Sequence, residues 1–132
     1  MGLNASLTDF IDKTKKQTKL KLKFRNELSN KKIPEDTAIV IYRVIQEALT
    51  NIIKHAKAKN ARVRLYTDKK NINLDISDDG VGCNLEKVLY RRGKPKLGIE
   101  GMRERVESLE GEFIITSAPK RGTQIKATLP KK

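Results

Sequence analysis

INLDISDDGVG, which runs from Ile72 to Gly82, is the stretch that says most about the fold. Apolar residues fill every second position as far as Ile76, and this period predicts a strand with one inward face. Asp78 falls in the same phase, so its carboxylate points inward and needs hydrogen-bond donors to offset the loss of water. Gly80 and Gly82 follow and let a ligand lie against the backbone. The stretch predicts a carboxylate that grips a donor group on a flat ligand, or a hairpin turn with an incidental acid.

The composition is that of a single globular domain, residues 1–132. Of these residues, 37% are hydrophobic and 34% are charged, which suits one two-layer core under a charged surface. No apolar run approaches about 18 residues and no secretory leader is visible, so we expect a cytoplasmic domain without membrane contact. One cysteine, Cys83, and one histidine, His55, exclude an internal disulfide framework and disfavour a structural zinc site.

The charge balance favours anionic partners. Lysine and arginine number 29 against 16 acids, a formal net charge of +13, and such a field attracts nucleic acid, anionic lipid, nucleotide phosphates or acidic proteins. The basic residues are dense at 13–32 and recur at 54–64 and 91–96. Aromatic side chains, which would stack on nucleobases, are scarce. A nucleic-acid-binding module is therefore one alternative, although a generic solvated surface explains the charge better.

Hydrophobic spacing along the rest of the chain predicts strands gathered in one layer and helices in another. Residues 83–97 show no clean period and predict a lid or an irregular segment. The expected fold class is an α/β (α+β) two-layer sandwich, a mixed sheet of about five strands covered on one face by about three helices. The expected helices are 7–16 (in an N-terminal segment 1–18), 35–58 and 99–109, and the expected strands are 20–25, 61–67, 72–78, 112–117 and 123–129.

The long helix at 35–58 carries a polar stripe. Glu47, Asn51 and Lys54 lie within about 60° of one another, on the side that we expect to be opposite the apolar stripe, and His55 flanks them. Mg²⁺ prefers a few oxygen ligands and keeps its waters, so an amide oxygen with substrate phosphates is a plausible shell. A lysine offers a point charge to phosphate oxygens. The alternative is the solvated face of an amphipathic helix.

Taken in chain order, these motifs are far more specific than any one of them. The long helix contains YRVIQEALTN at 42–51, the strand ends in DDGVG at 78–82, and GIEGMRER at 98–105 and Gly122-Thr123 follow. The set resembles the asparagine-containing box and the three glycine-rich boxes of the ATP-binding domain of bacterial sensor histidine kinases. The amino-acid sequence of these motifs is most similar to that of the subfamily whose response regulators carry helix-turn-helix output domains. The resemblance covers about residues 33–130.

The resemblance implies a Bergerat-type ATP-binding fold with a defined adenine end. Asp78 would accept the adenine amino group, and Thr123 would help on the same side through water. Gly80 and Gly82 would let the nucleotide and the lid at 83–97 approach.

The resemblance also implies a phosphate end. Asn51 would ligate Mg²⁺, and Glu47 beside it would position water or metal and is the candidate catalytic base. Lys54 and His55 would face the phosphates. Backbone N–H groups where the last helix begins would form an anion site, which adds these cofactor-binding residues: Gly98, Ile99, Gly101 and Met102.

The chain departs from the family pattern at two places. Lys96 stands where the second glycine-rich box usually opens with a glycine, and with Arg91, Arg92 and Lys94 it adds positive charge to the lid. Cys83 stands where the family often has an aromatic or aliphatic residue, and we interpret it as an incidental lining residue.

The implied function is transfer of the γ-phosphate of ATP to a histidine on a separate dimerisation domain, in two-component signalling. The only histidine here is His55, inside the expected site, and no helical hairpin precedes the fold. We therefore expect a monomeric catalytic fragment that binds ATP or ADP, works with the phosphoacceptor domain and indirectly with a response regulator, and does not phosphorylate itself. An acid beside the accepting histidine could replace Glu47 as base. The alternatives are an anti-sigma factor type serine kinase and the nucleic-acid module.

Overall fold

The computed structural model describes residues 2–28, 33–89 and 98–131. Within these ranges the chain forms four α-helices, a short π-helical turn and five strands. Their bounds, in chain order, are α1 Leu3–Gln17, β1 Lys21–Asn26, α2 Glu35–Asn51, the π-helical turn η1 Ile52–Ala56, β2 Asn60–Thr67, β3 Asn71–Asp78, α3 Leu85–Leu89, α4 Ile99–Glu107, β4 Glu112–Ser117 and β5 Thr123–Pro130.

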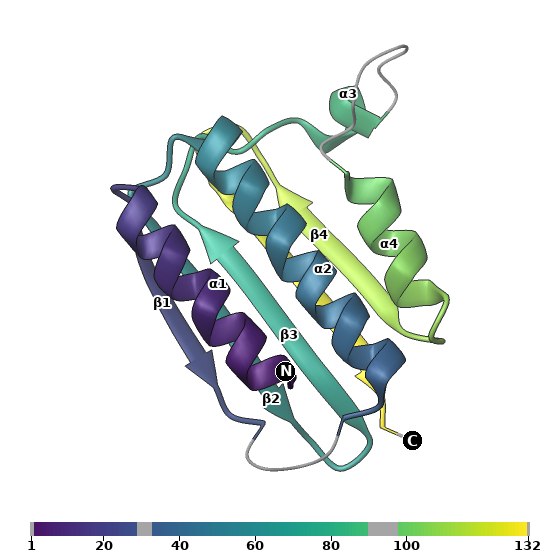
Figure 1. Cartoon of the computed structure of the whole chain (residues 1–132). Helices are drawn as coiled ribbons and strands as arrows, with labels where there is room; N and C mark the ends of the chain where they lie inside the picture. Colours follow the sequence, from purple (N-terminus) through teal and green to yellow (C-terminus); the bar gives the residue numbers. More distant parts are fainter. Residues whose placement is uncertain (1, 29–32, 90–97, 132) are drawn as a thin grey trace.

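The strands form one mixed sheet in the order β1-β2-β3-β5-β4. β1 pairs with β2 in parallel, and the other neighbours are antiparallel. Figure 1 shows α1, α2 and α4 side by side over one face of this sheet. The expected two-layer sandwich with a mixed sheet is therefore confirmed. The parallel pairing of β1 was not visible in the sequence, because an alternating strand does not reveal the direction of its neighbour.

The core lies between the sheet and the helices. Strand β2 alternates exposed and buried residues, with Ala61, Val63 and Leu65 inward. Leu74 and Ile76 of β3 lie opposite Leu65 and Val63 and are also buried. This period of two places every inward apolar group under the helices and leaves the polar residues on the open face.

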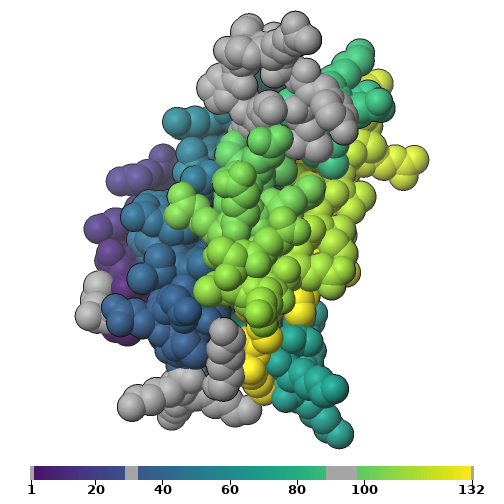
Figure 2. Space-filling model, turned by 90° about the vertical axis from the view of Figure 1, so that its right-hand side faces the viewer, coloured from purple at the N-terminus to yellow at the C-terminus, as the bar shows by residue number. Residues whose placement is uncertain are grey.

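Helix α2 covers the centre of the sheet with a wider apolar stripe than we expected. The spacing of apolar residues predicts that Ile41, Ile45, Ala48, Ile52 and Ala56 face the sheet, and all of these but Ala56, which is partly buried, are buried. Val40, Val44 and Leu49 are buried as well. The stripe therefore reaches round toward α4, which Figure 2 shows (green) beside α2 (blue). As a consequence Glu47 and Asn51 flank the buried stripe instead of lying opposite it, and the sequence prediction of their side was wrong.

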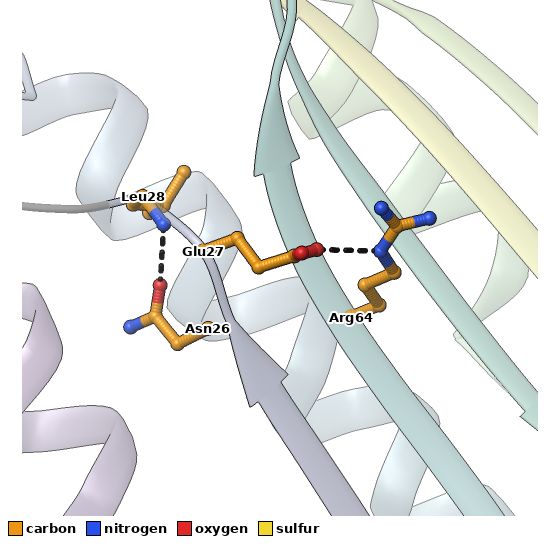
Figure 3. A network of polar contacts seen from close by, with 4 residues as sticks. All are labelled: Asn26, Glu27, Leu28 and Arg64. Carbon is orange, nitrogen blue, oxygen red and sulfur yellow. Dashed lines mark hydrogen bonds and ion pairs between the residues drawn. The ribbon is translucent and has the colours of Figure 1, made fainter.

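The end of β1 is fixed by polar contacts with β2 (Figure 3). The Glu27 N–H donates to the Leu65 carbonyl at 2.7 Å, and the Glu27 carboxylate accepts a 2.6 Å hydrogen bond from Nε of Arg64. The Asn26 side chain accepts the N–H of Leu28 at 3.1 Å. These bonds turn the chain away from the sheet and bring Leu28 into the core.

Two further differences from the sequence prediction concern helices. The helix expected at 35–58 is α-helical only to Asn51, continues as η1 to Ala56, and ends at Lys57 in the left-handed conformation (φ 52°). A short helix, α3, lies inside the segment expected to be a lid. In the part of the chain that the structure describes, no helix has the length and apolar character needed to span a bilayer.

Candidate functional site

A cavity of about 770 Å³ lies where α2, η1 and β3 end and α4 begins. Most of the side chains selected from the sequence meet there, although they come from four separate segments. The predicted residues that line it are Glu47, Asn51, Lys54, His55, Asp78, Gly82, Gly98, Ile99 and Thr123. Gly80, Gly101 and Met102 are not among the lining residues.

Asp78 lies at the end of β3 and is half-buried in the cavity wall. Its Oδ1 accepts the N–H of Gly80 at 2.7 Å. Burial raises the pKa of the Asp78 carboxyl above its ordinary value, the nearby charge of Asp79 adds to the rise, and the N–H groups of Gly80 and Thr123 oppose it. A half-buried acceptor facing a cavity suits a ligand that donates a hydrogen bond.

Asp79, which the sequence reasoning passed over, fastens the loop that follows β3. Its carboxylate accepts the N–H groups of Lys59 and Asn60, each at 2.9 Å, and the Asn60 side-chain amide at 2.8 Å. These bonds lower the pKa of Asp79. The second acid of the pair therefore points away from the cavity and holds the start of β2 against the end of β3.

The loop after Asp79 lies between η1 and the turn that joins β4 to β5. The N–H of Val81 donates to Ala56 at 2.7 Å, and the carbonyl of Val81 accepts the N–H of Lys120 at 2.6 Å. A Cβ on Gly82 would lie 2.0 Å from the carbonyl oxygen of Ala118, and φ there is +63°. The close approach of the protein's own backbone therefore requires a glycine at position 82 whether or not a ligand binds, and the expectation that Gly82 leaves room for a ligand stays a prediction. Gly80 is buried and supplies the N–H that Asp78 accepts.

The polar end of the cavity is built on α2 and η1. Glu47 and Asn51 lie one helical turn apart, and Lys54 and His55 follow in the π-helical turn, exposed at the rim. π-Helical turns often occur at functional sites because the extra residue changes the direction in which the following side chains point. The sequence predicted these four residues but not the change of helix type.

The donor atoms at this end fit a hydrated Mg²⁺ shared with a ligand. No group of three His, Cys, Asp or Glu side chains able to hold a metal ion exists among the described residues. The Glu47 carboxylate and the Asn51 amide are oxygen ligands of the kind Mg²⁺ prefers, and Mg²⁺ usually takes one or two protein ligands and completes its shell with water and phosphate. A dedicated all-protein metal cage is not what these residues make.

Helix α4 begins against Glu47. Gly98 precedes the helix with φ +67°, and a Cβ there would lie 2.0 Å from Oε2 of Glu47. The Gly98 carbonyl accepts the N–H of Met102 at 3.0 Å, which starts the helix. Ile99 and Met102 are fully buried beneath it, so Met102 is a core residue, whereas Gly101 has no heavy atom within 4 Å of the position a Cβ would take.

A hydroxyl network that the sequence did not predict holds the other side of the cavity. The Ser117 hydroxyl accepts the N–H of Cys83 at 2.9 Å, lies 3.0 Å from the Gly122 carbonyl, and lies 2.8 Å from the Thr123 hydroxyl. Thr123 and Cys83 both line the cavity. Ser117 therefore orients Thr123 and ties the chain after Gly82 to the strand pair β4–β5.

Apolar side chains complete the wall, and sequence reasoning missed them as site residues. Ile76 of β3, Ile125 of β5 and Ile115 of β4 face the cavity from the sheet, while Leu85 and Val88 of α3 face it from the other side. The alternating pattern of the strands predicts that the three isoleucines point inward. That pattern does not distinguish a residue that packs under a helix from one that lines a pocket. Arg91, Arg92, Lys94 and Lys96 lie outside the described residues.

The chain matches one protein family and several sensor kinases. Residues 36–132 match the family described as histidine kinase-, DNA gyrase B-, and HSP90-like ATPases. The chain is 31% identical over 130 residues to the signal transduction histidine-protein kinase/phosphatase DegS of Brevibacillus brevis, with 98% of this chain and 33% of that protein covered. It is 32% identical over 134 residues to the oxygen sensor histidine kinase NreB of Staphylococcus carnosus, with 98% and 37% covered. The chain thus spans about a third of the length of these relatives.

Solved structures show the same fold. The blue-light activated histidine kinase of Erythrobacter litoralis superposes with a TM-score of 0.78 at 21% identity, over 99% of this chain and 42% of that one. The mycobacterial sensor histidine kinase MprB superposes with a TM-score of 0.66 at 21% identity, over 96% and 95%.

The raised pKa of Asp78 predicts a pH-dependent effect on stability. In the unfolded chain the Asp78 carboxyl loses its proton near its ordinary pKa of 3.8, whereas in the folded chain it keeps the proton to higher pH. The contribution of Asp78 to the free energy of unfolding is therefore present at low pH and is lost as pH rises from 3.8 through the folded pKa. Asp78→Asn keeps an oxygen that can accept the Gly80 N–H, and because the amide does not ionise, the variant does not lose stability in this way as pH rises. We expect the midpoint of urea unfolding of the variant, relative to the wild type, to increase between about pH 4 and pH 7. Asp12→Asn, on the exposed face of α1, is the control, and a parallel shift in both variants would contradict the interpretation.

The contact between Glu47 and Gly98 predicts coupled effects of two substitutions. Gly98→Ala should lower the free energy of unfolding through left-handed backbone strain of about 1–2 kcal/mol and through the clash with the carboxylate. In a Glu47→Ala background only the strain should remain, and a double-mutant cycle measured by denaturant unfolding gives the difference. Gly101→Ala, within α4 and without a close neighbour, should instead stabilise by about 0.5–1 kcal/mol. Additive effects at Gly98 and Glu47 would show that the contact carries no energy.

Proposed function

Because the chain belongs to the histidine kinase-, DNA gyrase B-, and HSP90-like ATPase family, we propose that its cavity binds ATP with Mg²⁺ and that the domain supplies the γ-phosphate to a histidine on a separate dimerisation domain of a sensor histidine kinase. The observation that carries the proposal is that Asp78 and the pair Glu47 and Asn51 line one cavity of about 770 Å³. This volume lies within the usual range for a site that encloses a small ligand, about 300–1,000 Å³. The sensor kinase names of the relatives agree with it.

The adenine would occupy the apolar part of the cavity. Ile76, Ile115 and Ile125 offer a wall for a flat ring, and the Asp78 carboxylate would accept the exocyclic amino group. An ionised acceptor makes a stronger hydrogen bond than a neutral one. Thr123, oriented by Ser117 at 2.8 Å, would contact the ring through water. These contacts favour a purine that carries an amino group and disfavour one that carries a carbonyl at the same position, because two acceptors would then face each other.

The triphosphate would lie toward α2 and the start of α4. Asn51 and Glu47 would hold Mg²⁺, which neutralises the charge that develops on the phosphate oxygens. Lys54 would face the same oxygens with a point charge, His55 would lie beside it, and the first N–H groups of α4 would point toward the anion. Gly98 and Gly101 add no side chain of their own at this end of the helix.

The reaction itself requires little covalent chemistry from this domain. Phosphoryl transfer depends mainly on positioning and on charge neutralisation, and the attacking imidazole would come from the dimerisation domain. Glu47 would accept the proton of that imidazole, and its proximity to Gly98 supports a further role in positioning the start of α4. ATP as the donor places the reaction in the cytoplasm, with a response regulator as the indirect recipient of the phosphate.

Two alternatives are weaker. An anti-sigma factor type serine kinase would share this fold, but DegS, NreB and the sensor histidine kinase YdfH of Bacillus subtilis, to which the chain is 39% identical over 95 residues, carry histidine kinase names. A basic nucleic-acid module would not need an inward carboxylate in a cavity. Its binding would fall steeply with salt and would not depend on Asp78.

The central test is titration of a non-hydrolysable ATP analogue, with and without Mg²⁺. Asp78→Asn should weaken binding by about 1.5–3 kcal/mol, the range for a hydrogen bond to a charged group. Asn51→Ala should remove most of the gain that Mg²⁺ gives while leaving binding in its absence nearly unchanged. Asp75→Asn, on the same strand but on the open face of the sheet, is the matched control. Equal affinity of Asp78→Asn and wild type would refute the assignment of the adenine end.

A second test addresses the phosphate acceptor. Incubated alone with ATP labelled at the γ-phosphate, the chain should gain no alkali-stable phosphate, because its only histidine, His55, lies at the rim of the nucleotide cavity. ATP hydrolysis should be slow at most. Labelled phosphate that disappears on substitution of His55 by glutamine would show transfer within the chain and contradict the need for a separate domain.

A further inference from the structure

A second hollow lies behind η1, on the side away from the nucleotide cavity. It has a volume of about 580 Å³ and is formed where α1 ends, β1 and β2 begin, and η1 ends. Figure 1 shows these ends of α1, β1 and α2 gathered at one end of the molecule. We call this hollow, lined by residues 17–21, 52–53 and 57–60, the basal groove. Ile52 lines both cavities, so the π-helical turn is the wall between them.

The basal groove has an apolar floor that solvent reaches. Leu20, Ile52 and Ile53 line it, and Ile53 is 45% exposed. Few large apolar side chains of the described residues are so exposed, and this one lines a hollow beside Leu20 and Ile52. Covering its side chain would remove apolar surface from water, which favours a ligand with an apolar group.

The rim of the basal groove is positively charged. Lys19, Lys21, Lys57 and Lys59 line it and are exposed, and no acidic residue is among its lining residues. Asp79 contacts two of the lining residues, because its carboxylate accepts the N–H groups of Lys59 and Asn60. The four ammonium groups therefore attract an anionic ligand without competition from a carboxylate in the groove lining.

The positive charge continues from the groove onto the open face of the sheet. Lys21 begins β1, and Lys23 and Arg25 follow it on the same face. Lys23 lies opposite Arg62 of β2, and Arg25 lies opposite Arg64, in the register of the parallel pair. Like charges directly opposite each other lower sheet stability, and only Arg64 is balanced by a described ion pair, with Glu27. Asp75 of β3 lies opposite Arg64 on this face, and the five basic residues of β1 and β2 still give the strip next to the groove a net positive charge.

We propose that the basal groove and the adjoining strip of β1 and β2 bind an acidic protein segment that inserts an apolar side chain between Leu20 and Ile53. Carboxylates of the segment would complement the lysines and arginines, and an apolar side chain would cover the apolar floor. The ligand therefore needs both acidic and apolar side chains. A single-stranded nucleic acid fits less well, because no aromatic side chain lines the groove and Tyr66, on the sheet face, is covered by Arg64 at 4.1 Å. A bilayer surface fits less well, because one half-exposed isoleucine offers little area for insertion.

The test measures binding of a fluorescein-labelled peptide of alternating glutamate and leucine to the full chain of 132 residues by fluorescence anisotropy. Ile53→Ser should weaken binding by about tenfold, the loss expected for one partly buried aliphatic side chain. The pair Lys19→Gln and Lys21→Gln should weaken it by about tenfold or more. The matched controls are Ile39→Ser, which is 52% exposed on α2 outside the groove, and Lys69→Gln with Lys70→Gln, exposed in the turn between β2 and β3. The controls should change binding by less than about twofold.

Several results would overturn the proposal. No measurable binding of the peptide by the wild type would do so, as would equal losses in the groove variants and the control variants, which indicate attraction by net charge alone. A second peptide with serine in place of leucine should bind about tenfold more weakly, and equal affinity would remove the role of the apolar floor. Tighter, groove-dependent binding of an oligothymidine or of phosphatidylserine vesicles would assign the surface to another class of partner. The circular dichroism of each variant must match the wild type.

Discussion

The site depends on one constraint, a carboxylate that ends an apolar strand inside the molecule. The phase of β3 fixes Asp78 on the same side as Leu74 and Ile76, and burial there raises its pKa. The carboxylate remains usable because Gly80 donates to it at 2.7 Å, and because Asp79 anchors the same loop to the start of β2. The two adjacent acids thus have different roles. Asp79 stabilises the loop, and Asp78 faces a cavity with oxygen lone pairs that can accept further hydrogen bonds.

The loop after β3 also explains why segments distant in sequence meet at this site. The N–H of Val81 donates to the end of η1, its carbonyl accepts from the β4–β5 turn, and Ser117 connects Cys83 with Thr123. These bonds are short-range and polar, whereas α2 and α4 are held by apolar packing over the sheet. A rigid two-layer core therefore supports a polar rim whose geometry is set by a few backbone hydrogen bonds. Changes in the core should alter stability, and changes in the rim should alter binding, with Gly98 and Glu47 as the place where both meet.

Much of this arrangement could be predicted from the sequence, for identifiable reasons. The periods of two and of about 3.6 residues located every described strand and the three larger helices. The spacing from Glu47 to His55 and from Asp78 to Gly82 picked out residues most of which line one cavity, and their roles there stay predictions. The predictions that failed were those that depend on which other elements a residue contacts in the folded chain. The side of Glu47 and Asn51 was wrong because Val40 and Val44 are buried through contact with another element, and the π-helical turn has no signature in a single sequence. Ser117 was missed because a serine in a strand is unremarkable until its partners are known.

The net charge of the chain predicts an anionic ligand, but the positions of the described charged residues show that the proposed nucleotide cavity is not where the basic residues gather. A charge of +13 favours polyanions, yet the described part of the nucleotide cavity carries two carboxylates beside Lys54 and His55 and is not strongly basic. Seven of the basic residues lie outside the described residues, at 31–32, 91–96 and 132. Among the described residues, basic side chains gather on β1, on β2 and around the basal groove. In the proposed function an inward acid and an oxygen pair would select a nucleotide through local hydrogen bonds and metal contacts, whereas a broad basic surface acts over longer distances and weakens with salt. The two features therefore have separate causes, and the η1 residue Ile52, which lines both cavities, is the point at which they are physically closest.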